Sequence, residues 1–148
     1  RGVELEARAG LTENLNLIAN YTYTDIKVTK SNDVDRGMHI PGVPRNMASI
    51  WADYKLSGQF TGLKVAGGLR MLGETYGDYV ESFNVPGYTL VDMSARYDLS
   101  KANTSLKGAE LALSARNLMD KRYAICDDIT SCEYGSRRTV LGTMTYRW

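Results

Sequence analysis

The sequence lacks long apolar runs, has almost no net charge and contains one histidine and two cysteines. No stretch of the 148 residues approaches the roughly 18 apolar residues of a transmembrane helix. A net charge of +1 argues against a nucleic-acid partner, which would require a basic patch. No nucleophile elbow, phosphate-binding glycine loop, HExxH or Cys-His motif is present. We therefore expect no catalytic residues and no enzymatic activity.

The first residues do not resemble a signal peptide, because no positively charged segment leads into an apolar run. Residues 1–5 already follow the alternating pattern of a strand. Either a signal peptide was removed or this chain is a piece of a longer protein. Because the strand pattern is already present in the first residues, the second interpretation, a piece of a longer protein, is favoured.

The last ten residues carry the clearest structural signal. Apolar or small side chains alternate with polar ones, which predicts a β-strand because successive side chains point to opposite faces. One face carries Val140, Gly142, Met144, Tyr146 and Trp148. In a soluble protein such a terminal strand would be an aggregation-prone edge. In an outer-membrane barrel it would be the closing strand, with aromatic side chains at the membrane interface.

Seven segments alternate in this way, and their connections are short and long in turn. The expected strands are residues 2–9, 15–28, 46–56, 63–71, 88–99, 109–116 and 139–148. The long connections are residues 29–44, 77–87 and 117–136. Strands of about 9–13 residues can cross a bilayer at a tilt. Short periplasmic turns and long extracellular loops are typical of outer-membrane barrels.

Charged residues fall on the polar face of these segments: Glu4, Glu6, Arg8, Arg70, Asp92, Arg96, Glu110, Arg116 and Arg147. An arginine facing lipid at the membrane midplane would cost roughly 2–4 kcal/mol, whereas one facing a wet lumen costs little. A soluble β-sandwich with one solvated face explains the alternation equally well. It explains neither the strand length nor the aromatic end.

The expected fold is therefore an all-β, antiparallel transmembrane β-barrel, of which this chain is one part. Bacterial single-chain barrels have even strand numbers from eight upward, and an open edge in lipid leaves amides unpaired. We expect residues 1–148 to form a C-terminal segment of about seven strands that does not fold alone in a membrane.

Several motifs resemble those of TonB-dependent outer-membrane receptors. Residues 113–123, LSARNLMDKRY, resemble the family's NLFDKxY signature before the last extracellular loop, and residues 145–148, TYRW, resemble its TYRF ending. Residues 85–92 resemble VPGYTxxD, residues 134–138 the G-x-x-R start of the final strand, and residues 40–45 a proline-bearing loop exit. Residues 3–6 and 20–25 are similar to a further strand pair. Met119 and Trp148 depart from the usual phenylalanines but keep apolar or aromatic character.

The resemblance implies a 22-stranded barrel with an N-terminal plug, located in the bacterial outer membrane. Such receptors bind a ferric siderophore outside and import it through TonB, which contacts the plug; the plug is absent here. The cysteine pair in the last loop resembles that of the ferrichrome and other hydroxamate-type receptors within this family. No cofactor is implied beyond the ferric siderophore ligand. Lumenal charges such as Arg70, Arg96 and Arg116 would face the plug or the permeation route. A passive barrel, porin-like or structural, is the alternative, and a soluble β-sandwich binding module is the third.

Cys126 and Cys132 lie six residues apart in the last long connection, which would face an oxidising exterior, so a disulfide is expected. A metal site is the rival interpretation, but the spacing is not CxxC and no histidine is nearby in sequence. Around them, Asp127, Asp128 and Glu133 would either bind a cation or be solvated loop charge.

Three aromatic residues around the second long connection, Tyr76, Tyr79 and Phe83, would contact a siderophore or belong to the outer aromatic girdle. His39 would be a loop residue or a minor ligand contact. At the C-terminus, Met144, Tyr146 and Trp148 are expected to form the signal for the membrane-assembly machinery, and the strands themselves to contact outer-membrane lipid.

Overall fold

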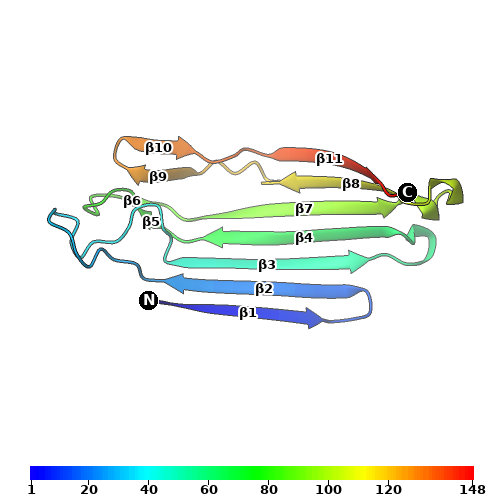
Figure 1. Cartoon of the computed structure of the whole chain (residues 1–148), viewed down its shortest axis with the longest axis horizontal. Coiled ribbons are helices and arrows are strands. Elements are labelled where there is room, and N and C mark those ends of the chain that lie inside the picture. Colours follow the sequence, from blue (N-terminus) through cyan, green and yellow to red (C-terminus); the bar gives the residue numbers. More distant parts are fainter.

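The computed structural model describes residues 1–148 and contains one seven-stranded antiparallel sheet (Figure 1). Its strands, in spatial order, are β1 (Gly2–Gly10), β2 (Leu15–Thr24), β3 (Asn46–Lys55), β4 (Leu63–Leu72), β7 (Tyr88–Asp98), β8 (Ala109–Arg116) and β11 (Thr139–Tyr146). All seven expected strands are present. The second ends at Thr24 rather than at residue 28, and the last ends at Tyr146 rather than at Trp148.

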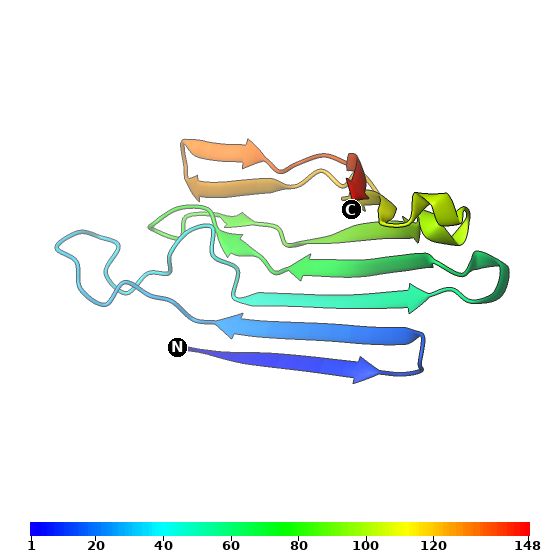
Figure 2. The same cartoon turned by 45° about the vertical axis from the view of Figure 1, so that its right-hand side comes forward.

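Smaller elements lie in the connections. Two hairpins, β5 (Thr75–Tyr76) with β6 (Asn84–Val85) and β9 (Ala124–Asp128) with β10 (Ser131–Tyr134), lie beyond the sheet at the end opposite the short turns (Figure 2). The short turns contain three 3-10 helices, η1 (Gly58–Phe60), η2 (Leu99–Lys101) and η3 (Thr104–Leu106). Both hairpins lie in segments that the sequence pattern assigns to loops, because strands this short have too few residues to show alternation. No helix has the length and hydropathy needed to cross a membrane.

The strand register keeps apolar positions opposite apolar positions. One row of directly opposed residues runs through Ala7, Ala19, Ile50, Leu69 and Val91 on five neighbouring strands. Because side chains alternate with a period of two, this one register places every odd-numbered position of β1 and its partners on a single face. We call it the apolar face, and the opposite one the polar face.

The apolar face has no protein layer over it. Leu5 is 61% exposed, Leu113 55% and Met144 66%, and only 11 of the 148 residues are buried. A β-sandwich would cover such side chains with a second sheet, whereas all seven long strands here lie in one sheet. Exposed apolar side chains over the whole face of a sheet require lipid as their solvent. This arrangement contradicts the sandwich interpretation.

All charged residues of the seven long strands lie on the polar face, and they include eight of the nine positions expected there; the ninth, Arg147, follows the end of β11. Near the middle of this face Arg70 Nε donates to Asp92 Oδ2 at 2.5 Å. Beside this pair, on adjacent strands, Trp51 lies directly opposite Gly68, and its indole covers the glycine. A Cβ built on Gly68 would lie 2.1 Å from Trp51 Cε3, so the ring occupies the space that a side chain would need.

We predict that Gly68→Ala destabilises the complete barrel while Gly67→Ala does not. The added methyl at position 68 must displace Trp51, and overpacking of this kind costs about 1–3 kcal/mol. At position 67 the nearest atoms to an added Cβ, Asp92 O and Met93 Cγ, are 3.7 Å away, which is ordinary contact. The thermal unfolding midpoint in detergent measures both effects. Equal midpoints for the two variants would contradict the packing of Trp51 on Gly68.

Candidate functional site

The three long connections lie together at one end of the sheet (Figure 1). We call them loop 1 (residues 25–45), loop 2 (residues 73–87) and loop 3 (residues 117–138). They meet at Gly42, whose N–H donates to Tyr76 O of loop 2 at 3.0 Å. Gly42 has a φ of 71°, and a Cβ there would lie 3.0 Å from Cys126 O of loop 3. Only glycine combines this backbone conformation with such a close approach, so Gly42 allows the three loops to pack on one another.

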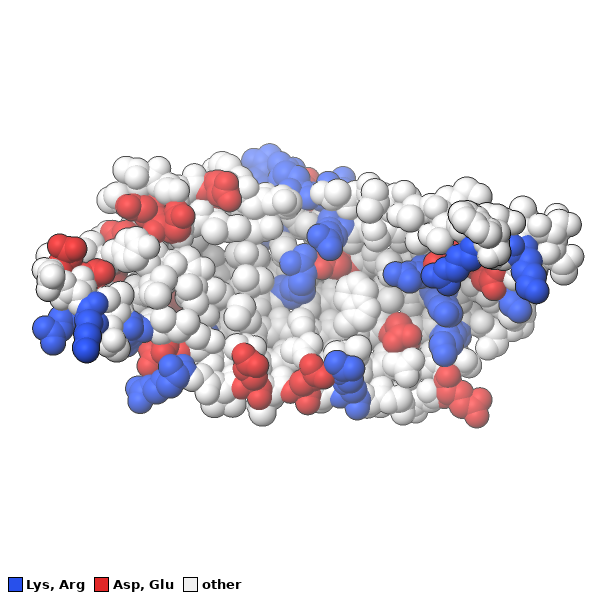
Figure 3. All heavy atoms as spheres, viewed as in Figure 1, with Lys and Arg blue, Asp and Glu red and all other residues white.

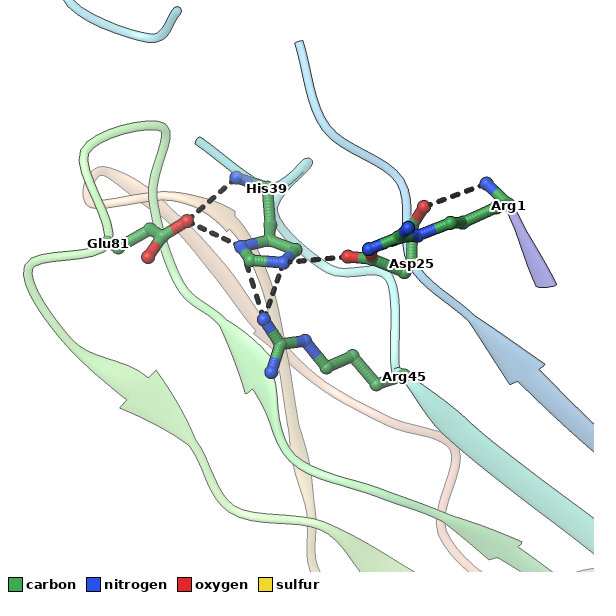
Figure 4. Close-up of polar contacts among 5 residues, drawn as sticks. All are labelled: Arg1, Asp25, His39, Arg45 and Glu81. Atoms are coloured by element: carbon green, nitrogen blue, oxygen red, sulfur yellow. Dashed lines mark hydrogen bonds and ion pairs between the residues drawn. The ribbon is translucent and has the colours of Figure 1, made fainter. Parts of the chain in front are cut away.

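A buried histidine links loop 1 to loop 2 (Figure 4). His39 is 7% exposed, and both its backbone N–H, at 2.7 Å, and its ring Nδ1, at 2.6 Å, contact Glu81 Oε1. On the other side of the ring, Nε2 lies 3.1 Å from Asp25 Oδ1 and 2.5 Å from Arg45 Nη2. The His39 ring also stacks on Tyr76, with 4.9 Å between ring centroids. We call His39, Asp25, Glu81, Arg45 and Tyr76 the His39 junction.

The local fold of loop 2 brings Glu81 to this junction. Asp78, which is buried, accepts a hydrogen bond from the Ser82 backbone N–H at 2.8 Å and another from the Ser82 hydroxyl. This tight turn holds Glu81 at a φ of 57°, in the left-handed region. That backbone conformation turns the Glu81 carboxylate toward loop 1. Hydrogen bonding by Ser82 holds the pKa of Asp78 below its usual value, so the turn contains a carboxylate.

Both acids of the His39 junction are stabilised in their charged form. The His39 backbone and ring lower the pKa of Glu81. The Arg1 side chain, followed by His39, lowers the pKa of Asp25, against the opposing effect of burial. The guanidinium of Arg45 lies 5.5 Å from the centroid of the Tyr76 ring, within the range of a cation–π contact. The junction is therefore a polar connection between loops 1 and 2, in which the Arg45 guanidinium and the His39 ring lie among two carboxylates.

A cavity beside the junction has a volume of about 30 Å³, and His39, Arg45, Glu74 and Tyr76 are among its lining residues. Pockets for small organic ligands usually measure roughly 300–1,000 Å³. The cavity is thus too small for an organic chelate, and the junction shapes the loops rather than enclosing a ligand. His39 occupies a structural position inside loop 1.

The three aromatic residues of the expected ligand contact differ in their surroundings. Tyr79 is 47% exposed, at the tip of loop 2. Tyr76 is held against His39, and Phe83 covers Gly77, where an added Cβ would lie 2.0 Å from Phe83 Cε2. Tyr79 is therefore the most exposed of the three, while the rings of Tyr76 and Phe83 pack against other residues of the loops.

Loop 3 is closed at its base by Asn117. This residue is 2% exposed and adopts a φ of 49°. Its Nδ2 donates to Lys121 O at 2.9 Å and to Ser136 O at 3.0 Å, while its Oδ1 accepts from the Lys121 N–H at 2.8 Å. Its own N–H donates to Asp92 Oδ1 at 2.8 Å. Asn117 thus ties both ends of loop 3 to the charged pair on the polar face.

Asp120 adds a second tie across the same loop. It accepts from Arg137 Nε at 2.7 Å and from the Arg138 backbone N–H at 3.0 Å, and the second Arg137 nitrogen also contacts it. These hydrogen bonds, led by that of the Arg137 side chain, hold the pKa of the Asp120 carboxyl far below its usual value.

Further out in loop 3, the expected disulfide is present. Cys126 and Cys132 are directly opposite each other in the β9–β10 hairpin, with a Cα–Cα distance of 4.1 Å. The loop acids Asp127, Asp128 and Glu133 are exposed on this hairpin. No group of three or more His, Cys, Asp or Glu side chains is placed to hold a metal ion.

Sequence reasoning missed most of the residues that join the loops, among them Gly42, Asp25, Glu81, Arg45 and Asp78. Their hydrogen-bond partners lie up to 42 positions away along the chain, and no spacing pattern marks such pairs. Asn117 and Gly42 carried a usable signal, because asparagine and glycine are the residues that most readily adopt positive φ.

Comparison with known proteins gives a consistent result. Residues 1–118 match the family described as TonB dependent receptor-like, beta-barrel. The chain is 41% identical over 150 residues to the ferrichrome outer membrane transporter/phage receptor of Escherichia coli K12, covering all of this chain and 20% of that protein. It is 39% identical over 148 residues to the ferrioxamine B receptor of Salmonella typhimurium, covering 99% of this chain and 21% of that protein.

Solved structures agree with the sequence relatives. The siderophore receptor PiuA of Acinetobacter baumannii superposes with a TM-score of 0.77 at 29% identity, covering 98% of this chain and 21% of that one. The ferric preacinetobactin receptor BauA of the same species gives a TM-score of 0.80 at 25% identity, over the same shares of the two chains. The chain spans about a fifth of the length of the proteins that it matches.

We predict that Asp120→Asn destabilises the barrel above pH 5 and that this difference shrinks as the pH falls below about 4. A carboxyl whose pKa is lowered by folding stabilises the folded state fully above its unfolded pKa of about 3.9, and it loses that effect as it is protonated. Thermal unfolding midpoints of both proteins from pH 7 to pH 3 measure the difference. Asp127→Asn is the control, because Asp127 is exposed on the same loop, and it should show no such trend. A pH-independent difference for Asp120→Asn would contradict the assignment.

Proposed function

The chain belongs to the β-barrel family of TonB-dependent receptors, and on that premise we propose that it forms the C-terminal wall and three extracellular loops of a receptor for ferric siderophores of the hydroxamate class. The observation that carries the proposal is the similarity over the entire chain, loops included, to receptors named for ferrichrome and ferrioxamine B. Both names denote hydroxamate siderophores. The complete receptor would lie in the bacterial outer membrane and would transport rather than catalyse.

The loop architecture supports a ligand-facing role. Loops 1, 2 and 3 contact one another through Gly42 and the His39 junction, so they form one connected surface rather than three independent loops. A preorganised surface binds with a smaller loss of conformational entropy than flexible loops do. Within this surface we propose that the Tyr79 ring contacts the siderophore. Tyr76 and Phe83 would stabilise loop 2 through their packing on His39 and Gly77.

The other partners follow from the same assignment. The apolar face would contact outer-membrane lipid, and TonB would act through the plug of the complete receptor. The assembly machinery would recognise the closing strand, where Met144 and Tyr146 lie on the apolar face and the Trp148 ring lies 6.5 Å from that of Tyr146.

We expect the full-length receptor to restore uptake of iron-55 ferrichrome or ferrioxamine B in a strain that lacks its own hydroxamate receptors. Uptake should disappear when TonB is deleted or when a protonophore collapses the proton gradient, because energy reaches the outer membrane only through TonB. A ferric catecholate serves as the control ligand and should not be taken up. Uptake that persists without TonB would instead identify a passive barrel.

We predict that Tyr79→Ala weakens binding of the ferric hydroxamate to the full-length receptor roughly fivefold, which corresponds to the loss of about 1 kcal/mol of aromatic contact. Tyr79→Phe keeps the ring and should bind nearly as well as the unmodified receptor. Quenching of intrinsic fluorescence on titration with the ferric siderophore gives the Kd. Unchanged affinity in Tyr79→Ala would place the ligand contacts elsewhere.

A further inference from the structure

Charged side chains of both signs lie close together at the loop end of the molecule (Figure 3). Among them, the buried His39 ring lies between carboxylates from two loops (Figure 4). Its Nδ1 is 2.6 Å from Glu81 Oε1 of loop 2, and its Nε2 is 3.1 Å from Asp25 Oδ1 of loop 1. A buried imidazole with an acid at each nitrogen is sensitive to its own protonation.

The two neighbours of Nε2 require opposite protonation states of this nitrogen. Arg45 Nη2, at 2.5 Å, can only donate a hydrogen bond, so it requires an Nε2 without a proton. An ionised Asp25 carboxylate can only accept, so it requires an Nε2 that carries one. No single state of the ring satisfies both contacts. The proton on Nε2 therefore determines which neighbour the ring binds.

At the other ring nitrogen the partner is the same in both states. Glu81 Oε1 accepts from Nδ1 and also from the His39 backbone N–H, at 2.7 Å, so Nδ1 keeps its proton. A proton added at Nε2 therefore produces the imidazolium cation. Histidine is the side chain whose charge ordinarily changes between about pH 5 and pH 8.

The surrounding groups keep their charge over this interval. Hydrogen bonds from the His39 backbone and ring lower the pKa of Glu81, and the hydrogen bond from the Arg1 side chain lowers the pKa of Asp25, so both acids stay ionised. The other neighbours are Lys27, which forms a β-bridge with His39, and Tyr76, which stacks on its ring. Arginine, lysine and tyrosine side chains titrate at about pH 10 or above. The ring of His39 is therefore the group in the junction that changes.

Arg45 has no carboxylate partner of its own. It forms no ion pair within 4.0 Å, its buried Nε has no hydrogen-bond partner, and its side chain donates only to the His39 ring. The cavity beside the junction is lined by Arg45 and by Glu74 of loop 2, the one carboxylate among its lining residues. Glu74 is exposed and also lacks an ion pair. An Arg45 side chain released from His39 thus has a loop 2 acid across the cavity.

We propose that His39 is a pH-sensitive latch between loops 1 and 2. In the neutral ring, Nε2 accepts a hydrogen bond from Arg45. A proton taken up at Nε2 makes the ring a cation, which donates to Asp25 and repels the guanidinium. Arg45 then pairs with Glu74, and the imidazolium forms charge-assisted hydrogen bonds with Glu81 and Asp25. Acid therefore adds ionic contacts between loop 1 and loop 2.

This inference rests on the proposed function in one respect only: the loops must face the cell exterior, where they meet the pH of the medium. It does not depend on which ligand is transported. Loops 1 and 2 would keep one relative position in an acidic medium and would vary more in position at neutral pH.

Pulsed electron paramagnetic resonance on the full-length receptor in detergent tests the latch. Spin labels are attached at two exposed positions, Val34→Cys in loop 1 and Val80→Cys in loop 2, while Cys126 and Cys132 are joined in their disulfide and take no label. We expect the distribution of distances between the labels to be narrower at about pH 5 than at about pH 8, because added contacts hold the loops together. An identical distribution at both pH values would overturn the proposal.

Three variants of the labelled receptor identify the groups responsible. His39→Gln keeps a hydrogen-bonding side chain that never becomes charged, so its distribution should not change with pH. Glu74→Gln should lose most of the narrowing, whereas Asp127→Asn, an exposed change in loop 3, should keep it. Resistance to unfolding in detergent at room temperature establishes that each variant is folded.

Narrowing that persists in His39→Gln would assign the pH response to another group and reject the latch. Full narrowing in Glu74→Gln would contradict the transfer of Arg45. Uptake of ferric hydroxamate by the unmodified receptor is measured separately. A receptor that takes up the ligand but shows no pH-dependent distances rejects this inference alone, whereas a pH-dependent distance without uptake rejects only the proposed function.

Discussion

The structure depends on one constraint: within a bilayer, every backbone N–H and C=O must find a partner in the protein. Antiparallel pairing of each long strand with its neighbour meets this requirement across the sheet, and it also determines the side-chain arrangement. Once Ala7 pairs with Ala19, and Ala19 with Ile50, the period of two decides the face of every other residue in those strands. The clean separation of an apolar and a polar face is a consequence of register. It requires no packing between layers, and little of the chain is buried.

Outside the sheet a different principle operates. The loops cannot rely on a continuous ladder of hydrogen bonds, so a few buried polar side chains fix their shape. The Asn117 side chain satisfies three backbone groups around the base of loop 3, and its own N–H donates to Asp92. His39 connects acids from two loops. Both are more than nine-tenths buried. Burial of such groups is costly unless they are hydrogen-bonded, so the network holds the loops in one arrangement.

Alternation predicted the seven strands, both faces and the end of the sheet at which the loops lie, because it is a local signal that extends over eight or more residues. It also placed Arg70 and Asp92 on the same face, though not in contact. The β9–β10 hairpin escaped prediction because its strands have five and four residues. The His39 junction escaped because Asp25, His39 and Glu81 share no spacing rule; the turn made by Asp78 and Ser82 brings the last of them into place. The disulfide was predictable from the cysteine count and the expected exterior location.

The order of the long strands in the sheet is the same as their order along the chain, and the two small hairpins lie to one side. Each long strand therefore needs only the strand before it as a template, and closing each connection is entropically inexpensive. Each pair of neighbouring long strands has its own register, and the shared strand links one pair to the next. A slip of one residue at any one pairing would place the two strands of that pair on opposite faces and would turn charges of the polar face toward the lipid. The two faces of the wall are thus specified pairing by pairing, at each of the six pairs of neighbouring long strands.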